Sequence, residues 1–469
     1  MKTASSRFGI LVTLLLAATS LNASNAAPDV IGEVIDLSIH RGSPSHSGQL
    51  GRAANADSDI ESDADLVWST SLSFPDADYI APHFSHFDVP MGAYVVVRSP
   101  DGIRSWTYRG RGKDALSRGE GFWGVHIYGT TAIVELYSTR PIVADSVVID
   151  RFARGFSAEE MARDKSVINP LSLCSTDDSL WAKCYQTSEP NAYNKARAVA
   201  RLMINGTGAC TGWLVGNQGH VITNEHCITA AADATNTTFE FLAEGATCAT
   251  SCATWGGCPG TIAATTSTLI KNSTTFDYAL VKLPTNLSGT YGFMQLRSTG
   301  AVVNERIYIP QHPAAWGKKI AMKDGTANAT IGSLNQPPCA GGTSDVGYNA
   351  DTQGGSSGSP VLGYGDNLVV ALHHCGTCPN RAVPIQSVIS DLGALLPAGS
   401  LPGAPPVNTP PTVSISSPAS GSTVTGSTTV SASANDDVAV TKVEFYLDGT
   451  LQSTDTTSPF SWSWAPTSA

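Results

Sequence analysis

The chain has 469 residues, of which 42% are hydrophobic and 14% charged, so it has the composition of a folded protein of about three domains. Its formal net charge of −11 argues against nucleic acid or an anionic membrane surface as a partner, because both require clustered lysine and arginine. Low charge, short apolar runs and frequent turn residues favour β structure over helical bundles.

The first residues have the pattern of a secretory signal. Lys2 and Arg7 precede an apolar run from Phe8 to Ala18, and small residues follow at 24–26. This run is too short to span a bilayer and is not repeated elsewhere in the chain. We therefore expect a signal peptide at 1–26, secretion to the extracellular space and no membrane span.

All ten cysteines lie between Cys174 and Cys378. An even number of cysteines in an exported chain predicts disulfides rather than zinc, and we expect no metal and no cofactor. Their confinement marks one separate domain, for which we expect the bounds 174–397.

Residues 27–165 have the pattern of an antiparallel β-sandwich, because alternating segments are separated by turn residues. The expected strands include Tyr94–Arg98, Ser105–Tyr108 and Ala132–Tyr137. A short helix is predicted over roughly 157–165, where Arg163 and Lys165 are candidate processing sites.

The central domain combines many short strands with one terminal helix, a pattern that fits paired β-barrels. The helix is expected at Ile385–Leu396. The expected strands are Ala198–Ile204, Thr211–Val215, His220–Thr223, Tyr278–Leu283 and Leu368–Leu372.

The C-terminal part begins with a Pro/Gly linker at 398–411. Residues 412–469 are rich in Thr and Ser and resemble a bacterial immunoglobulin-like module about two strands short of a full sandwich, so a truncated module is expected. Its strands are predicted at Thr412–Ile415, Thr428–Ala434 and Thr441–Gly449.

One glycine-rich run, GGSSGSP at 354–360, has features of a nucleophile loop. Glycine tolerates positive φ, so such a turn can direct the amides of Gly355 and Ser357 at one point, where an oxyanion would develop in acyl transfer. A serine is inert there unless a base removes its proton. The run therefore requires a histidine and an acid elsewhere.

His226 is the candidate base, because it ends a strand and stands beside Cys227. A disulfide between Cys227 and Cys210, across the preceding hairpin, would close a short loop worth roughly 3 kcal/mol and fix the imidazole. Asp277 heads an apolar strand, where a buried carboxylate could accept the other ring proton of the histidine.

With the order His, Asp, Ser, the central domain resembles the chymotrypsin-fold serine proteases, above all the bacterial lysyl endopeptidase group, with some kinship to the glutamyl endopeptidases. The segments that carry the resemblance are CTGWLV at 210–215, ITNEHC at 222–227, FDYALVKL at 276–283, GGSSGSP at 354–360 and ALHHCG at 371–376. The resemblance implies a double β-barrel with His226 as general base, Asp277 as its orienting carboxylate and Ser357 as nucleophile. Residues 27–165 would then be a pro-region or an accessory domain.

The resemblance also implies most of the disulfide pairing. Cys174 is expected to pair with Cys378 and Cys184 with Cys248. The remaining cysteines are expected to pair locally, as Cys252 with Cys258 and Cys339 with Cys375.

Three positions depart from the family pattern. Ser356 replaces the aspartate that pairs with a new N-terminus in the animal enzymes, so that activation switch is absent. Asn224 and Glu225 replace small residues before the histidine, and we expect their side chains to point away from the site.

The substrate preference has two interpretations. Asp351 lies six residues before Ser357, where a buried carboxylate would pair with a substrate Lys or Arg. A histidine at the position of His373 serves acidic specificity in the glutamyl enzymes. The segment from His373 through His374 to Gly376 would pair with the substrate backbone, and we favour a basic residue before the scissile bond.

The sequence thus predicts a secreted, monomeric serine endopeptidase that acts on proteins or peptides. The alternative from another class is a secreted binding or adhesion protein with a vestigial protease domain. The complete triad with its glycines argues against this alternative.

Overall fold

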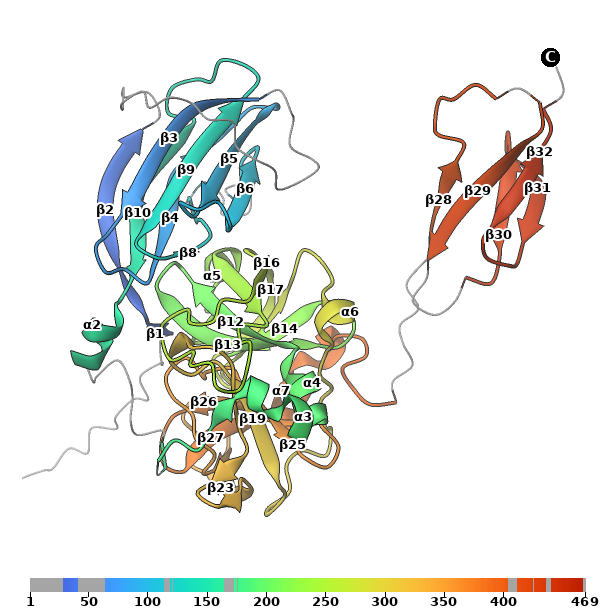
Figure 1. The fold of residues 1–469 in the computed structure, drawn as a ribbon. Helices are drawn as coiled ribbons and strands as arrows, with labels where there is room; N and C mark the ends of the chain where they lie inside the picture. The colour runs from blue at the N-terminus through green and yellow to red at the C-terminus, as the bar shows by residue number, and fades with distance from the viewer. Residues whose placement is uncertain are drawn as a thin grey trace, which may run out of the picture.

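A computed structural model of the chain describes residues 28–40, 64–113, 119, 121–163, 173–174, 176–403, 411–424, 426–435 and 440–466. The expected signal peptide and Lys165 lie outside these ranges. The fold is mostly β, as expected, and its strands form three groups along the chain (Figure 1).

The N-terminal group is a β-sandwich of two antiparallel sheets, with strand orders β2-β10-β4-β7 and β3-β9-β5-β6, and β8 pairs with β4. The strands are β2 Gly32–His40, β3 Asp65–Ser73, β4 Tyr79–Phe87, β5 Ala93–Arg98, β6 Ser105–Arg109, β7 Phe122–Trp123, β8 Ile127–Tyr128, β9 Thr131–Ser138 and β10 Val147–Gly155. The three expected strands lie within β5, β6 and β9. Phe84, Phe87 and Phe122 are completely buried between the sheets, which explains the alternating pattern.

A short helix, α2 Ala158–Arg163, follows the sandwich. Its start is fixed by reciprocal hydrogen bonds, because the Ser157 amide donates to Glu160 at 2.7 Å and the Glu160 amide donates to the Ser157 hydroxyl at 3.3 Å.

The central domain contains two eight-stranded antiparallel sheets. The first has the order β16-β15-β12-β13-β14-β18-β17, with the N-terminal strand β1, Asp29–Val30, paired to β13. Its other strands are β12 Val199–Ile204, β13 Gly208–Val215, β14 His220–Thr223, β15 Thr237–Phe241, β16 Thr261–Ala264, β17 Thr268–Ser273 and β18 Tyr278–Lys282.

The second sheet has the order β11-β20-β19-β25-β26-β27-β24-β23. Its strands are β11 Leu180–Trp181, β19 Ile307–Gln311, β20 Lys319–Ala321, β23 Ile331–Gln336, β24 Asp345–Tyr348, β25 Pro360–Gly363, β26 Val369–Cys375 and β27 Asn380–Pro384, and β21 Lys323–Asp324 pairs with β22 Ala327–Asn328 beside them. The two sheets form the double β-barrel expected from the sequence. The five expected strands of this domain correspond to β12, β13, β14, β18 and β26.

The terminal helix is shorter than expected. α7 spans Ile385–Leu392 and is followed by the 3₁₀ turn η4, Gly393–Leu395. Gly393 has a φ of 52°, a left-handed conformation that ends the α-helix before Leu396. The sequence did not indicate the other short helical segments, α3 Tyr185–Ser188, α4 Pro190–Ala196, α5 Ala231–Thr235, α6 Ser288–Tyr291, η2 Ala182–Cys184 and η3 Pro313–Ala315.

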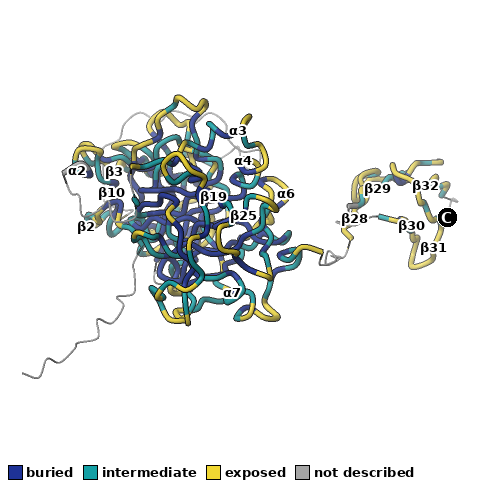
Figure 2. The backbone as a smooth tube through the Cα atoms, turned by 90° about the horizontal axis from the view of Figure 1, so that it is seen from below, coloured by how far each residue is buried: buried dark blue, intermediate teal, exposed yellow. Residues whose placement is uncertain are grey.

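No helix in the described ranges is long and apolar enough to cross a bilayer. One hydrophobic core runs through both barrels, and it includes Trp213 and Leu280 from the first and Leu372 from the second. Figure 2 shows this interior as the dense dark-blue region of the tube.

The structure pairs all ten cysteines in the expected way. The five disulfides are Cys174–Cys378, Cys184–Cys248, Cys210–Cys227, Cys252–Cys258 and Cys339–Cys375. All of them lie in the central domain and its N-terminal lead, so they cross-link the barrels and leave the other two groups of strands unstapled.

The C-terminal group contains β28 Thr412–Ser417, β29 Thr428–Asn435, β30 Val443–Leu447, β31 Thr450–Asp455 and β32 Ser461–Trp464. β28, β29 and β32 form one sheet and β30 and β31 another. β30 begins two residues later than expected and ends at Leu447, before the Asp448-Gly449 turn to β31. Val413 and Ile415 are each 65% exposed, in contrast to the buried strands of the other groups (Figure 2).

The sandwich contacts the first barrel through a buried polar cluster. Glu240 and Arg201, both completely buried, form an ion pair of 2.7 Å. The hydroxyl of Tyr128 from the sandwich donates to Glu240 at 2.6 Å and accepts from Arg201 at 2.9 Å. Burial opposes ionisation of Glu240, but Arg201, His126 and Tyr128 hold its pKa well below the usual range. The sandwich therefore completes the hydrogen bonding of charges inside the barrel.

We predict that Tyr128→Phe lowers the free energy of unfolding by about 1–3 kcal/mol, because it leaves buried charged groups without one partner. Urea unfolding of the full chain measures this effect. Tyr446→Phe is the matched control, since Tyr446 also donates to a glutamate, at 2.9 Å, but on an exposed surface. Equal effects of the two substitutions would contradict the proposed role of Tyr128.

Candidate active site

His226 lies in the turn after β14, which is held between β13 and β18. The next residue, Cys227, is bonded to Cys210 of β13, with the two Cα atoms 6.3 Å apart. The imidazole is fixed by this disulfide and by the barrel, and His226 is only 4% exposed.

Asp277 stands directly before β18 with a φ of 40°, a left-handed conformation that aspartate tolerates better than most residues. Its carboxylate accepts the His226 amide at 3.0 Å and lies 2.9 Å from the Nδ1 atom of the same residue. Burial opposes ionisation of Asp277, but hydrogen bonds from His226 and His374 outweigh it and hold its pKa well below the usual range. A charged Asp277 therefore fixes the tautomer of His226 that carries the proton on Nδ1.

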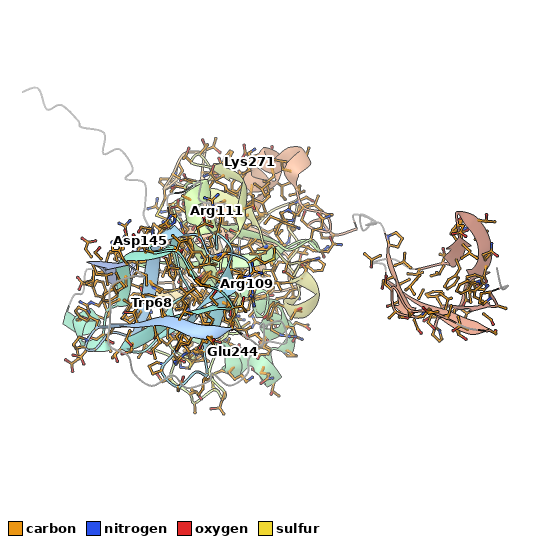
Figure 3. The ribbon with its side chains drawn as sticks, turned by 90° about the horizontal axis from the view of Figure 1, so that it is seen from above. Trp68, Arg109, Arg111, Asp145, Glu244 and Lys271 are labelled. Atoms are coloured by element: carbon orange, nitrogen blue, oxygen red, sulfur yellow. A yellow bond between two sulfur atoms is a disulfide. The ribbon has the colours of Figure 1, made fainter. Side chains whose placement is uncertain are left out.

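The strand that follows Asp277 is tied to the terminal helix. The hydroxyl of Tyr278 donates to Asp391 of α7 at 2.6 Å, and Lys271 of β17 forms an ion pair with the same carboxylate at 2.9 Å. Figure 3 labels Lys271 where it lies beside this helix. Helix and strand together hold the turn that presents Asp277.

His374 is a site residue whose side-chain role the sequence did not reveal. Its Nδ1 atom lies 3.2 Å from Asp277 Oδ2, and its Nε2 atom lies 2.8 Å from Asp345. Asp345 also accepts the amide of Cys339 at 2.9 Å. Burial alone would lower the pKa of His374, but the two carboxylates raise it to about 9, so the ring is charged at neutral pH.

The expectation for Asn224 was wrong. Its side chain does not point away from the site, because its amide nitrogen donates to the backbone carbonyl of Asp277 at 2.8 Å and the residue is completely buried. An amide is needed there to satisfy the carbonyl at the strained Asp277 turn. Glu225 is 8% exposed, and burial raises the pKa of its carboxyl.

The loop that carries Ser357 is held between the two barrels. The Thr211 amide of β13 donates to the Ser357 carbonyl at 2.8 Å, and the Gly358 amide donates to the His373 carbonyl of β26 at 2.9 Å. Gly355 and Gly358 have φ values of 85° and 87°, which favour glycine. Ser357 is partly exposed. Within the described range 176–403, which contains both residues, Ser357 forms no hydrogen bond with His226.

Ser356 is completely buried and has an internal role. Its hydroxyl accepts the Gln353 amide at 3.2 Å, and its carbonyl accepts the hydroxyl of Ser359 at 2.6 Å. Its hydroxyl is therefore committed to the conformation of the loop.

The amide of Gly355 donates to the carboxylate of Asp29, which belongs to β1 at the N-terminal end of the described chain. The two residues are 326 positions apart. No motif in the sequence connected Asp29 with this loop.

Asp351 and His373, the two candidate specificity residues, are both buried. The Oδ2 atom of Asp351 accepts the Asp178 amide at 2.7 Å, whereas its Oδ1 atom has no hydrogen-bond partner within the described part of the chain. Burial raises the pKa of Asp351. His373 lies 2.7 Å from the hydroxyl of Tyr348, and burial lowers its pKa to about 3, so its ring is neutral.

Gly376, one residue beyond β26, is partly exposed. The binding of substrate backbone by the strand end from His373 to Gly376 stays a prediction.

The double β-barrel, the pairing of His226 with Asp277 and the glycine-rich loop at Ser357 define the central domain as a trypsin-fold serine protease domain. Two family models match the chain: one described as a trypsin-like peptidase domain covers residues 210–372, and one described as a bacterial Ig domain covers residues 411–469.

Secreted RxLR effector protein 73 of Plasmopara viticola is 43% identical to this chain over 335 residues, which are 69% of this chain and 82% of that protein. The chain belongs to the same family as that protein.

Among solved structures, the chain is similar to the inactive form of the Rv3671c protease, with 15% identity, a TM-score of 0.33, and coverage of 45% of this chain and 95% of the other. It is also similar to Deg5, with 15% identity, a TM-score of 0.34, and coverage of 46% of this chain and 98% of the other.

We predict that the charge on His374 makes stability depend on pH. The pKa of this group is raised from about 6.5 to about 9 by folding, so its stabilisation is complete below pH 6.5 and is lost as the pH rises through 9. The loss is on the order of 3 kcal/mol. Urea unfolding of Ser357→Ala with and without His374→Gln, at pH 6 and pH 9.5, measures it.

The substitution should cost more stability at pH 6 than at pH 9.5. A difference between the two proteins that does not change with pH would contradict this assignment. Comparing the two proteins removes the contribution of other groups that titrate in this range.

Proposed function

We propose that the protein is a secreted serine endopeptidase that hydrolyses peptide bonds through His226, Asp277 and Ser357. The observation that carries this proposal is the charged, buried Asp277 bound to His226 Nδ1, because that bond leaves Nε2 unprotonated and able to act as a base. The loop held by Thr211 presents Ser357 from the neighbouring barrel.

In the proposed reaction His226 Nε2 takes the proton of the Ser357 hydroxyl as its oxygen attacks the carbonyl carbon of the scissile bond. The amides of Gly355 and Ser357 stabilise the oxyanion of the tetrahedral intermediate. The imidazolium then gives its proton to the leaving amine, and an acyl-enzyme remains. Water, activated by the same imidazole, hydrolyses the ester. The hydrogen bond from Ser357 to His226 is expected to form with substrate bound, since such bonds are often long in free enzymes.

Ser357→Ala should abolish peptidase activity and labelling by a fluorophosphonate, because this reagent forms a phosphonyl ester with the nucleophile and releases fluoride. Labelling of the secreted protein, read by mass spectrometry of the modified peptide, measures this. Ser356→Ala is the matched control and should still be labelled, since the Ser356 hydroxyl is committed inside the loop. Labelling that persists in Ser357→Ala would contradict the proposal.

We further propose that the enzyme prefers a basic residue before the scissile bond, because Asp351 stands six residues before Ser357, where trypsin-like enzymes place the carboxylate of this pocket. Asp351 Oδ1, a buried carboxylate oxygen that has no hydrogen-bond partner among the described residues, is a favourable partner for a substrate ammonium or guanidinium. The neighbouring acids Asp177 and Asp178 add negative charge, which raises the pKa of Asp351 in the absence of a cation. Acidic specificity is less well supported, because His373 is neutral and engaged with Tyr348.

Asp351→Asn should lower kcat/KM for substrates with Lys or Arg before the cleaved bond by about 100-fold, which is roughly 3 kcal/mol. The same variant should cleave substrates with an uncharged residue there at an unchanged rate, which serves as the internal control. A peptide library digested by the wild type and the variant measures both. A wild-type preference for Glu, or no effect of the substitution, would contradict the role of Asp351.

The alternative of a binding or adhesion protein with a vestigial protease domain is supported by the Ig domain and by the name of the relative, which is called an effector. The Ser357 labelling experiment separates the two, because a vestigial domain would not react. We favour the enzyme, since Asp277 retains the hydrogen bonds that keep it ionised.

The remaining parts of the proposal concern location and maturation. Five disulfides fit an oxidising, extracellular compartment, and the relative is named a secreted protein. We propose that residues 27–165 are a pro-region, with processing in the segment that follows α2.

A further inference from the structure

The N-terminal strand β1 lies beside the loop that carries Ser357. It pairs antiparallel with β13, and Asp29 stands opposite Ala209. Two residues further along β13, the Thr211 amide and hydroxyl bind the carbonyls of Ser357 and Gly355, each at 2.8 Å. β1 is thus a strand added to the sheet beside β13, and its first residue, Asp29, lies at the nucleophile loop.

The side chain of Asp29 points into the position expected for the oxyanion. Its Oδ2 atom accepts the amide of Gly355, and a β-carbon built on Gly354 would lie 2.4 Å from its Oδ1 atom. Burial raises the pKa of Asp29, while the hydrogen bond from Gly355 and the charge of His226 lower it. The carboxylate is therefore buried and bound by the amide that is expected to serve the oxyanion.

We propose that Asp29 is a built-in inhibitor whose carboxylate occupies the oxyanion hole and keeps the uncleaved chain inactive. This inference rests on the proposed function of Ser357. The tetrahedral intermediate needs the Gly355 amide for its own oxyanion, and that amide already donates to Asp29. A carboxylate also places negative charge where the intermediate would develop its own. The carboxylate of Asp29 and the oxyanion of the intermediate therefore compete for the same site.

The sandwich holds β1 in place. Ile31 is completely buried, its amide donates to the Thr207 carbonyl at 2.8 Å, and its carbonyl accepts the Phe156 amide at 3.1 Å. At Gly32 a β-carbon would lie 2.3 Å from the Arg154 carbonyl, so the chain passes tightly from the barrel into the sandwich. The Tyr79 hydroxyl donates to the Gly206 carbonyl at 2.8 Å, next to Thr207.

The covalent connection between Asp29 and the sandwich also provides a way to end the inhibition. In the order of the chain, Asp29 and the sandwich both precede the segment that follows α2. One cut in that segment therefore breaks the covalent connection of both to the barrels. Before the cut, the covalent tether gives Asp29 a high effective concentration at the loop. After the cut, the inhibitor can leave by dissociation of the sandwich.

The test measures the rate of fluorophosphonate labelling of the full-length, uncleaved chain, followed on the gel band of full size. Asp29→Ala should be labelled at least tenfold faster than the wild type, because the oxyanion hole becomes available. Asp29→Asn keeps the shape of the side chain without its charge and should give a rate between the two. Asp36→Ala is the matched control, since Asp36 is an exposed aspartate of β2 in the same segment.

Equal labelling of Ser357 in the wild type and in both Asp29 variants would overturn the inhibitor while leaving the proposed function intact. No labelling of any of these forms, including Asp29→Ala, would overturn the proposed function and the inhibitor together. Unfolding temperatures of the variants show whether they are folded. If Asp29→Ala does not fold, the nearly isosteric Asp29→Asn is compared with the wild type instead.

Discussion

The rest of the site depends on the interactions that keep the buried carboxylate of Asp277 charged. Removing a carboxylate from water costs several kcal/mol unless charges and hydrogen bonds compensate, and Asp277 is only 7% exposed. The compensation comes from both barrels, because His226 belongs to the first and His374 to the second. The site thus exists only when the two barrels are packed against each other.

Four side chains line up across the domain in the order Asp345, His374, Asp277 and His226, each hydrogen-bonded to the next. His374, whose ring is charged at neutral pH, is hydrogen-bonded to a carboxylate on each side, Asp345 and Asp277. An imidazolium on His226 is what the proposed reaction requires in its tetrahedral intermediate. Asp345 shares the charge of His374. Asp277 therefore remains available to the imidazolium that His226 becomes in the proposed reaction.

The sequence predicted those features that depend on local pattern. Strand alternation located β5, β9 and β14, and the adjacency of His226 to Cys227 indicated the fixed base. The side-chain roles of His374 and Asn224 could not be predicted, because both depend on which residues face Asp277 after the barrels fold. Asp29 was missed for the same reason, since its partner Gly355 is 326 residues away and no motif surrounds Asp29 in the sequence.

The N-terminal part of the chain supplies hydrogen-bond partners to the barrels at two places, and its proposed removal has a different consequence at each. At the first, Arg201 still donates to the Ala315 and Gly257 carbonyls, at 2.9 and 3.1 Å, and Glu240 still accepts the Gly260 amide at 2.8 Å. The buried ion pair therefore keeps partners within the barrel.

At the second place, the Gly355 amide loses Asp29, whereas the hydrogen bonds from Thr211 to the Ser357 and Gly355 carbonyls and from the Gly358 amide to the His373 carbonyl lie within the barrels. In the proposed maturation, loss of the sandwich leaves the Arg201–Glu240 pair with its partners in the barrel and frees the preorganised Gly355 amide for the substrate. Preorganisation of that donor is what gives it catalytic value, because no rearrangement has to be made during the reaction. The same rigidity makes the loop a good binding site for the carboxylate of Asp29 in the uncleaved chain.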